Sequence, residues 1–185
     1  IKERNNAFFF EYSRPTPIGQ LMAGLRYEHV NSDYYEQGVY SPAHSRTYSQ
    51  WFPSLTFATR IKEVGLQLSY SAKTSRPSYN QLGTNVAYIN RFTRQSGNPT
   101  LKPATLHNIS LVSNWDIFTF VANYTQTHNK IMYWNEQEST DENITNLRYR
   151  NFKRFPALTL SLTAAPRMGV WSPQLILFCQ KQWFD

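Results

Sequence analysis

The segment Gly65-Leu66-Gln67-Leu68-Ser69-Tyr70-Ser71-Ala72-Lys73 decides the fold, because apolar and polar side chains alternate along its whole length. Residues two apart project to the same face of a β-strand, so the segment predicts a strand with one apolar and one polar face. The same period recurs along most of the 185 residues, and no long segment with a helical period competes with it. We therefore expect an all-β protein.

Eight strands can be drawn from this period. They are expected near residues 5–14, 20–31, 46–60, 65–73, 104–115, from 118 to about 133, 147–164 and 173–184. The connections alternate strictly between short and long, and the long ones lie near 32–45, 75–103 and 134–146. Tight turns on one side and long loops on the other are typical of a transmembrane barrel. The pattern predicts an antiparallel up-and-down meander of about eight transmembrane strands within a larger barrel.

Composition agrees with strands that cross a membrane. The mean hydropathy is −0.55 and no run approaches the roughly 20 apolar residues of a membrane-spanning helix. Aromatic residues make up 16% of the chain. Several of them fall where interfacial girdles are expected, namely Trp115 and Trp171 at short-turn ends and Tyr27, Tyr48, Trp51, Tyr124 and Tyr133 toward long-loop ends. Cys179 is alone, which excludes an intrachain disulfide.

The formal charge of +7 is interpreted as a basic loop surface in preference to a nucleic-acid role. No basic helix, RNA-binding aromatic motif or zinc-finger spacing is present, so nucleic acid is disfavoured. For a barrel, the partners are outer-membrane lipid and the phosphates of lipopolysaccharide. Arg148, Arg150, Lys153 and Arg154 should stand above the hydrocarbon, where they would pair with such phosphates; alternatively, a bulge near Phe155-Pro156 turns them inward.

The sequence shows no catalytic chemistry. It contains no Ser-His-Asp arrangement, nucleophile elbow or phosphate loop, so we expect no enzyme and no cofactor. The four histidines lack a short metal-ligand spacing, and the acidic stretch of Glu136, Glu138, Asp141 and Glu142 fits no EF-hand, so no metal site is predicted.

Four motifs in order resemble a known family. They are Leu25-Arg26-Tyr27-Glu28 at a strand end, Trp51-Phe52-Pro53-Ser54-Leu55, Ser75-Arg76-Pro77-Ser78-Tyr79-Asn80-Gln81-Leu82, and Gly97-Asn98-Pro99-Thr100-Leu101-Lys102-Pro103. Their order and spacing resemble TonB-dependent receptors, in the branch of Bacteroidetes-type outer-membrane barrels. Ala104 departs from the pattern, since an acidic residue often follows the last Pro.

The resemblance implies a barrel of about 22 strands in the bacterial outer membrane, with an N-terminal plug in its lumen and energy supplied through TonB. The 185 residues contain no candidate plug, TonB box or signal peptide, so we expect a piece of the barrel wall. The motif residues are expected to shape the strands and the loop rather than touch ligand. They are Arg26, Tyr27, Glu28, Pro53, Arg76, Pro77, Gly97, Asn98, Pro99, Leu101, Lys102 and Pro103.

For an imported ligand, the longest loop offers aromatic and arginine side chains, namely Tyr79, Tyr88, Asn90, Arg91 and Arg94. These suit siderophores, other metal complexes, glycans or peptides, and packing within the loop is an equal alternative. Two rival hypotheses remain. A secreted β-sandwich could bind glycans through exposed aromatics, and an outer-membrane barrel could be a lipase or protease, although the nucleophile constellation is missing.

Overall fold

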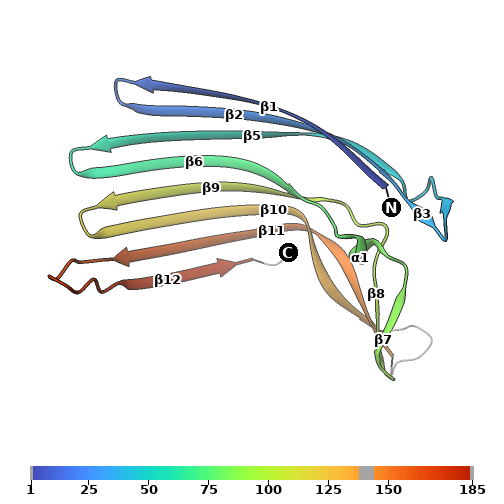
Figure 1. Ribbon diagram of the computed structural model, residues 1–185. Helices are drawn as coiled ribbons and strands as arrows, with labels where there is room; N and C mark the ends of the chain where they lie inside the picture. The colour runs from blue at the N-terminus through green and yellow to red at the C-terminus, as the bar shows by residue number, and fades with distance from the viewer. Residues whose placement is uncertain (1, 138–143, 184–185) are drawn as a thin grey trace.

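The computed structural model describes residues 2–137 and 144–183, and most of them lie in one curved antiparallel sheet (Figure 1). Its eight main strands follow the chain from edge to edge. They are β1 (Lys2–Thr16), β2 (Gly19–Asp33), β5 (Arg46–Ile61), β6 (Val64–Ser75), β9 (Ala104–Trp115), β10 (Phe118–Gln137), β11 (Thr145–Ala164) and β12 (Leu175–Gln182). The predicted all-β, up-and-down meander of eight strands is confirmed.

Two of the long connections contain further structure. The first holds a small hairpin of β3 (Tyr35–Glu36) and β4 (Val39–Tyr40). The second holds one helical turn, α1 (Tyr79–Leu82), and a hairpin of β7 (Val86–Asn90) and β8 (Thr93–Ser96). Strand β8 pairs in parallel with the outer end of β11, on the edge that β12 occupies lower down (Figure 1). The connection of residues 75–103 is therefore a folded element and no plain loop.

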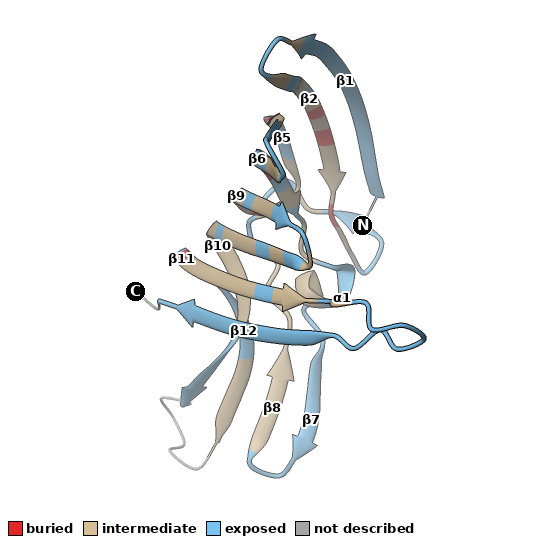
Figure 2. Cartoon of the chain, turned by 90° about the vertical axis from the view of Figure 1, so that its left-hand side faces the viewer, coloured by how far each residue is buried: buried red, intermediate tan, exposed pale blue. Residues whose placement is uncertain are grey.

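The strand register places the apolar residues on one face. Tyr70, Ile109, Tyr124 and Leu158 lie directly opposite one another across four strands, and so do Leu68 and Leu111. Much of this apolar face is exposed, and Leu68 keeps 52% of its surface accessible. Figure 2 shows how little of the sheet is buried, with β1, β7 and β12 exposed along almost their whole length.

The polar face carries mainly Ser, Thr, Asn, Gln and Gly, with a few charged residues. A β-sandwich would need a second sheet packed on the apolar face, and among the described residues no such layer exists. An apolar surface this extensive needs a cover, and the outer wall of a membrane barrel presents such a surface to lipid. The structure thus removes the sandwich rival. Among residues 2–137 and 144–183, no helix is long and apolar enough to cross a membrane.

The short turns are tight because single residues adopt the left-handed conformation there. Lys62 has a φ of 53° and Asp116 a φ of 47°, which hairpin turns of two residues require. The predicted turn of residues 15–19 is shorter in the structure, since Pro15 still pairs with Gln20 inside the hairpin. Pro15 lies next to the last pair of the hairpin, Thr16 and Gly19, beside the turn.

The largest departure from expectation is the hairpin of β10 and β11. The connection expected over residues 134–146 is strand at both of its ends, because β10 runs to Gln137 and β11 starts at Thr145. Of the acidic stretch, Glu138, Asp141 and Glu142 lie outside the described residues. Their neighbour Glu136 is on β10, with its carboxylate 3.7 Å from Arg150.

The bulge considered near Phe155-Pro156 is not present, since the register there is continuous. The irregular residue is Asn129, whose φ of 54° interrupts the alternation of side chains. Beyond it, the ammonium of Lys130 lies 3.3 Å from the centroid of the buried Phe155 ring. Beyond Asn129, the side chains of β10 therefore do not follow the alternation between apolar and polar face that holds nearer the short turn.

Candidate functional site

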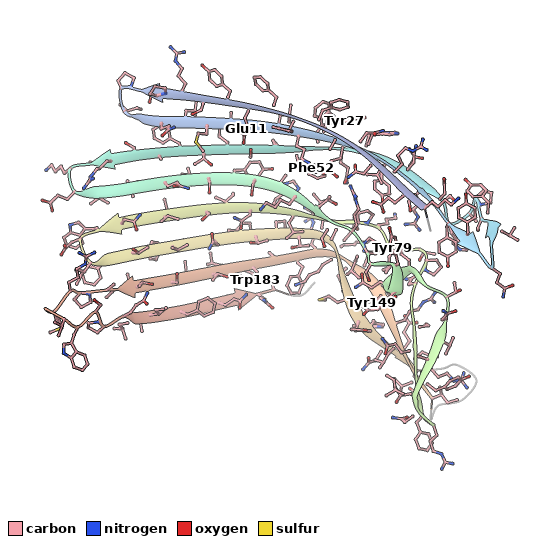
Figure 3. The ribbon with its side chains drawn as sticks, viewed as in Figure 1. Glu11, Tyr27, Phe52, Tyr79, Tyr149 and Trp183 are labelled. Atoms are coloured by element: carbon pink, nitrogen blue, oxygen red, sulfur yellow. The ribbon has the colours of Figure 1, made fainter. Side chains whose placement is uncertain are left out.

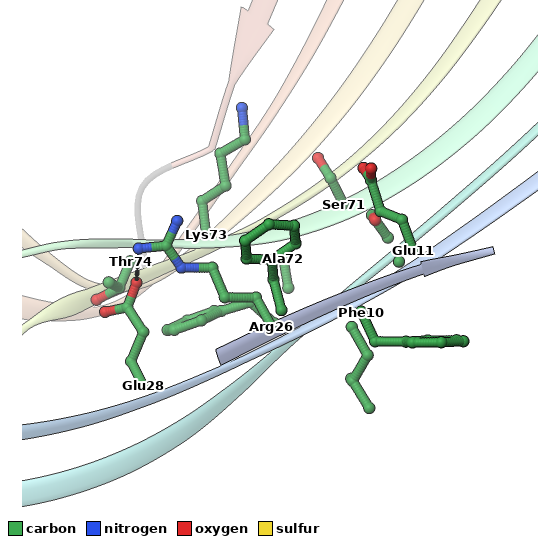
Figure 4. Close-up of a pocket in the computed structure, with 13 residues that line it drawn as sticks. Phe10, Glu11, Arg26, Glu28, Ser71, Ala72, Lys73 and Thr74 are labelled. Carbon is green, nitrogen blue, oxygen red and sulfur yellow. Dashed lines mark ion pairs between the residues drawn. The ribbon is translucent and has the colours of Figure 1, made fainter. Parts of the chain in front are cut away.

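An ion network ties the base of the longest connection to the polar face of the sheet. Glu28 of β2 is 7% exposed, and its carboxylate contacts Arg26 at 2.6 Å and Arg76 at 2.5 Å. Arg76 follows β6 and also reaches Glu3 of β1 at 2.8 Å. The Arg76 guanidinium thus links the end of β6 to β1 and β2. Figure 4 shows the ion pair of Arg26 with Glu28, which lies beside the hollow described next. Among the described residues, no acceptor pairs with the buried Nε of Arg76.

A hollow of about 520 Å³ opens beside this network on the polar face. Glu11 and Lys73 line it from β1 and β6, together with Phe9 and Phe52 (Figure 4). Gly24 and Ser54 also line the hollow, and a Cβ on Gly24 would lie 2.5 Å from the Ser54 hydroxyl. The hollow combines both charge signs with aromatic rings, so it can hold a polar segment or ligand inside the wall.

The Gly97–Pro103 motif is held from two strands. Arg46 of β5 donates from Nη1 to the Leu101 carbonyl at 2.5 Å and from Nη2 to the Pro99 carbonyl at 3.0 Å. Asn151 of β11 accepts from the Lys102 amide at 2.8 Å and donates to the Lys102 carbonyl at 2.9 Å. Leu101 is 1% exposed between them. The contacts of this motif are therefore made with the protein's own strands.

Gly97 itself packs against the end of α1. A Cβ at this position would meet the Gly83 carbonyl oxygen at 2.2 Å, a distance that no side chain could accommodate. The next residue, Asn98, donates its amide to the Gln81 carbonyl at 2.6 Å and its side chain to the Tyr149 carbonyl at 2.9 Å. Glycine is required here by the close approach of two backbones.

The structure separates the five residues expected to bind ligand. Tyr88 and Arg94 face each other across the β7–β8 hairpin, with the guanidinium 5.5 Å from the ring centroid. Arg91 lies at the tip beside Phe92. Asn90 uses its side chain to accept the Phe92 amide at 2.8 Å, which is a turn-forming contact. Tyr79 lies apart from them, on α1.

Tyr79 lines a second hollow, of about 330 Å³, between α1, the hairpin and β11. Tyr149 and Gln95 line it as well, and Figure 3 shows Tyr79 and Tyr149 near each other at α1. Gln95 donates to the Tyr133 hydroxyl at 2.8 Å, and the Tyr149 hydroxyl also donates to Tyr133. Burial raises the pKa of Tyr149, and its hydrogen bond with Tyr133 raises that pKa further. Tyr133, Tyr149 and Gln95 were not among the residues expected to bind ligand.

The aromatic girdle is only partly as expected. Tyr27 and Trp51 lie opposite each other on the apolar face, with ring centroids 4.6 Å apart. Tyr48 instead belongs to the polar face, where it lines a small recess together with Leu101 and Pro103. The expectation for Tyr48 was wrong because it lies an odd number of positions from Trp51, and alternation puts the two on opposite faces.

Metal ligands do not cluster in the described part of the chain, where no three His, Cys, Asp or Glu side chains come together. His29 contacts the Ser49 hydroxyl, and His44 contacts the Ser41 hydroxyl. His107 contacts the Tyr70 hydroxyl and lies beside His128 on the apolar face. His107 and His128 thus lie together, whereas His29 and His44 make separate polar contacts.

A comparison with known protein families identifies the kind of protein that has this geometry. Residues 1–172 match the outer membrane protein beta-barrel family. The chain belongs to this family. It is therefore a protein of the bacterial outer membrane, and its apolar face is the lipid-facing wall of a barrel. No curated protein sequence matches the chain significantly.

Solved structures with the same fold are outer-membrane receptors and transporters. The ferric enterobactin receptor of Pseudomonas aeruginosa aligns with a TM-score of 0.66 at 19% identity, over 96% of this chain and 27% of its own. The copper transporter OprC gives 0.64 at 14%, over 97% and 29%. The hemophore receptor HasR of Serratia marcescens gives 0.64 at 16%, over 97% and 34%. The chain thus spans about a third or less of these three proteins, and the likeness concerns the fold.

Proposed function

We propose that this chain is part of the wall of a TonB-dependent receptor that imports an anionic metal chelate across the outer membrane. The observation that carries the proposal is the inward attachment of residues 76–103. Arg76 pins the base of this connection to Glu3 and Glu28 on the polar face, and β8 docks its far end on β11. Aromatic and arginine side chains are thereby held at the long-loop end of the wall.

The chemistry of the hairpin favours an anionic ligand with ring faces. Arg91 and Arg94 supply two guanidinium groups that suit carboxylate or catecholate oxygens, and Tyr88 supplies a flat surface next to them. Proteins of similar fold are described as a ferric enterobactin receptor, a copper transporter and a hemophore receptor in complex with its hemophore and heme. A metal chelate is therefore preferred over a glycan or a peptide.

The remaining parts of the receptor follow from the motif resemblance. A barrel of about 22 strands would enclose a plug that lies outside these 185 residues, and the plug would contact the polar face and TonB. The order of the four motifs supports a place in the Bacteroidetes-type branch. In this proposal, the motif residues hold the loop and wall, and Tyr88, Arg91 and Arg94 face the ligand.

Uptake by cells that express the full-length protein tests the proposal. Ferric enterobactin and haem serve as anionic probes, and maltoheptaose and a zwitterionic pentapeptide as the alternatives. We expect uptake of one anionic chelate that disappears in cells without TonB and falls about tenfold or more in Arg91→Gln/Arg94→Gln, since two charge-assisted contacts are lost. Arg14→Gln/Arg60→Gln, near the short turns at the opposite rim, is the matched control. TonB-dependent uptake of the oligosaccharide or peptide alone would refute the chelate assignment.

A further inference from the structure

A third hollow, of about 450 Å³, lies on the polar face of strands β9, β10, β11 and β12. Thr127, which is 7% exposed, is opposite Leu106 and Phe155 in this hollow, and it lies three positions from Tyr124 of the apolar face. The volume falls within the range of about 300–1,000 Å³ that small-molecule sites have. We call this space the lysine hollow, because Lys130 lines it.

A single irregularity of the backbone brings Lys130 into the hollow. Regular alternation would put Lys130 on the apolar face, because it lies an odd number of positions from Thr127. Asn129 between them has a φ of 54°, a conformation that asparagine tolerates better than most residues. The Lys130 ammonium therefore lies on the polar face, 3.3 Å from the centroid of the Phe155 ring. The strand departs from regular geometry at the point that directs a lysine inward.

The strands that form the hollow provide no carboxylate for Lys130. Within their described bounds, β9, β10, β11 and β12 carry a single acidic residue, Glu136, and its carboxylate lies 3.7 Å from Arg150. The ring of Phe155 meets the ammonium from one side, so N–H donors remain on the other. A cation in partly apolar surroundings is stabilised when an oxyanion binds to it.

Other polar groups of the hollow can also donate to oxygen. Thr127 contributes a hydroxyl, and Gln180 and Gln182 of β12 contribute amides. Arg76 borders the same space. Its two Nη groups pair with carboxylates of β1 and β2, but its Nε is buried without an acceptor among the described residues. An oxyanion in the hollow therefore meets several donors and no carboxylate that would repel it.

The hollow offers no open ring face to a ligand. Phe155 is the one aromatic residue among the described residues that line it, and this side chain is 4% exposed beneath the Lys130 ammonium. On the β7–β8 hairpin, in contrast, Tyr88 keeps 71% of its surface exposed. A catecholate chelate surrounds its metal with aromatic rings, which favour ring partners. A carboxylate chelate presents oxygen atoms and short aliphatic chains, and these suit the hollow.

We propose that the lysine hollow binds a carboxylate-rich metal chelate, with Lys130 as its principal contact. The inference rests on the proposed function and narrows it, from anionic chelates in general to those whose charge is carried by carboxylates. Lys130 forms a charge-assisted hydrogen bond with one carboxylate, and Thr127 and the Gln182 amide bind further oxygen atoms. Leu106 and Ile131 lie along the aliphatic part. No described residue of β7 or β8 lines the hollow, so the site is separate from the hairpin.

Equilibrium binding of ferric citrate to the purified full-length receptor tests the site. Lys130→Gln should weaken binding about tenfold or more, because a charge-assisted contact is lost. Thr127→Val keeps the shape of the side chain and should weaken binding about fivefold. Lys130→Arg keeps the charge and should bind within about threefold of the wild type.

The matched control is Lys181→Gln. Lys181 also lies beside a ring, with its ammonium 5.2 Å from the centroid of Trp183, but it is opposite Leu158 on the apolar face. Its loss removes the same charge and should leave the affinity for ferric citrate unchanged. Heat-modified gel migration verifies that each variant barrel is folded.

The outcomes separate this site from the proposed function. The site is overturned if Lys130→Gln binds ferric citrate as tightly as the wild type, or if Lys181→Gln weakens binding equally. TonB-dependent uptake of ferric enterobactin without binding of ferric citrate would leave the proposed function standing and overturn the site. Binding of ferric citrate through Lys130 without TonB-dependent uptake would support the site and refute import.

An acidic side chain elsewhere in the full-length protein is the other source of a carboxylate. If such a side chain fills the hollow, the wild type should not bind ferric citrate, and Lys130→Gln should lower the melting temperature of the ligand-free receptor. That pair of results would also overturn the proposal.

Discussion

Replacing Arg76 by Gln should release the base of the connection of residues 76–103 from the wall. The Arg76 guanidinium makes one contact with the partly exposed carboxylate of Glu3 and one with the buried carboxylate of Glu28. The Glu3 contact is worth at most about 1 kcal/mol because both side chains reach water. The Glu28 contact is worth roughly 1.5–3 kcal/mol, but Arg26 stays beside that carboxylate and limits the loss. We expect a net cost of about 2 kcal/mol.

Two backbone amides report on this release. The Thr145 amide of β11 donates to the Phe92 carbonyl, and the Lys102 amide donates to Asn151 of β11. Both are protected only while the connection is docked. A cost of about 2 kcal/mol raises the local opening constant about 30-fold, so hydrogen exchange at both amides in the full-length Arg76→Gln protein should accelerate by that factor.

The matched control is Arg91→Gln, which removes the same charge from the hairpin tip and should leave both amides unchanged. Glu28→Gln should accelerate exchange like Arg76→Gln, and the double variant should add little, because the two side chains share one interaction. Exchange rates in Arg76→Gln within a factor of two of the wild type would refute the reasoning.

Three further outcomes follow from the packing. Gly97→Ala should cost about 1–3 kcal/mol by forcing a Cβ against the Gly83 carbonyl, which exchange at Asn98 would reveal; an unchanged rate would contradict the contact. A spin label at Leu68 should be reached by lipid-soluble oxygen and one at Ser69 by a water-soluble nickel chelate; the reverse would invert the faces. Asn151→Ala should cost roughly 2 kcal/mol by leaving backbone groups of residue 102 unpaired, with faster exchange of that amide; an unchanged rate would argue against the clamp.

The strands could be predicted from sequence because their signal is local. The bounds expected for residues 104–115 are those of β9, and the alternation from Leu66 to Ala72 places each side chain on the face expected for it. Alternation depends only on neighbouring residues, and proline or asparagine near the turns ends it. The face of Tyr48 was missed although its parity was readable.

The structure inside residues 75–103 was harder to predict because it depends on distant partners. Helix α1 had a local sign, since Ser78 and Gln81 have the spacing of a capping box, and the structure shows both capping contacts. Strand β8 had none. Its four residues pair with Thr145–Arg148, some fifty positions along the chain, and isolated segments of this length do not form strands.

The candidate site shows the same division. Arg91 and Arg94 could be chosen because arginine and tyrosine stand close together in a polar segment. Tyr149 could not, since its proximity to Gln95 depends on how β8 docks and on the extension of β11. The meeting of Glu28 with Arg76 also crosses 48 positions and is visible only once the sheet is assembled.

The positions of the clamps separate the part of the connection that must be kept from the part that can vary. Arg46, Arg76 and Asn151 hold its two ends through carboxylates and backbone groups, and none of them contacts the β7–β8 tip. Backbone acceptors do not depend on the identity of the residue that carries them. Substitutions at the tip can therefore change the ligand without loosening the connection, whereas substitutions at the clamps move the whole tip. This division explains why the recognisable motifs flank the hairpin and the aromatic and arginine residues lie between them.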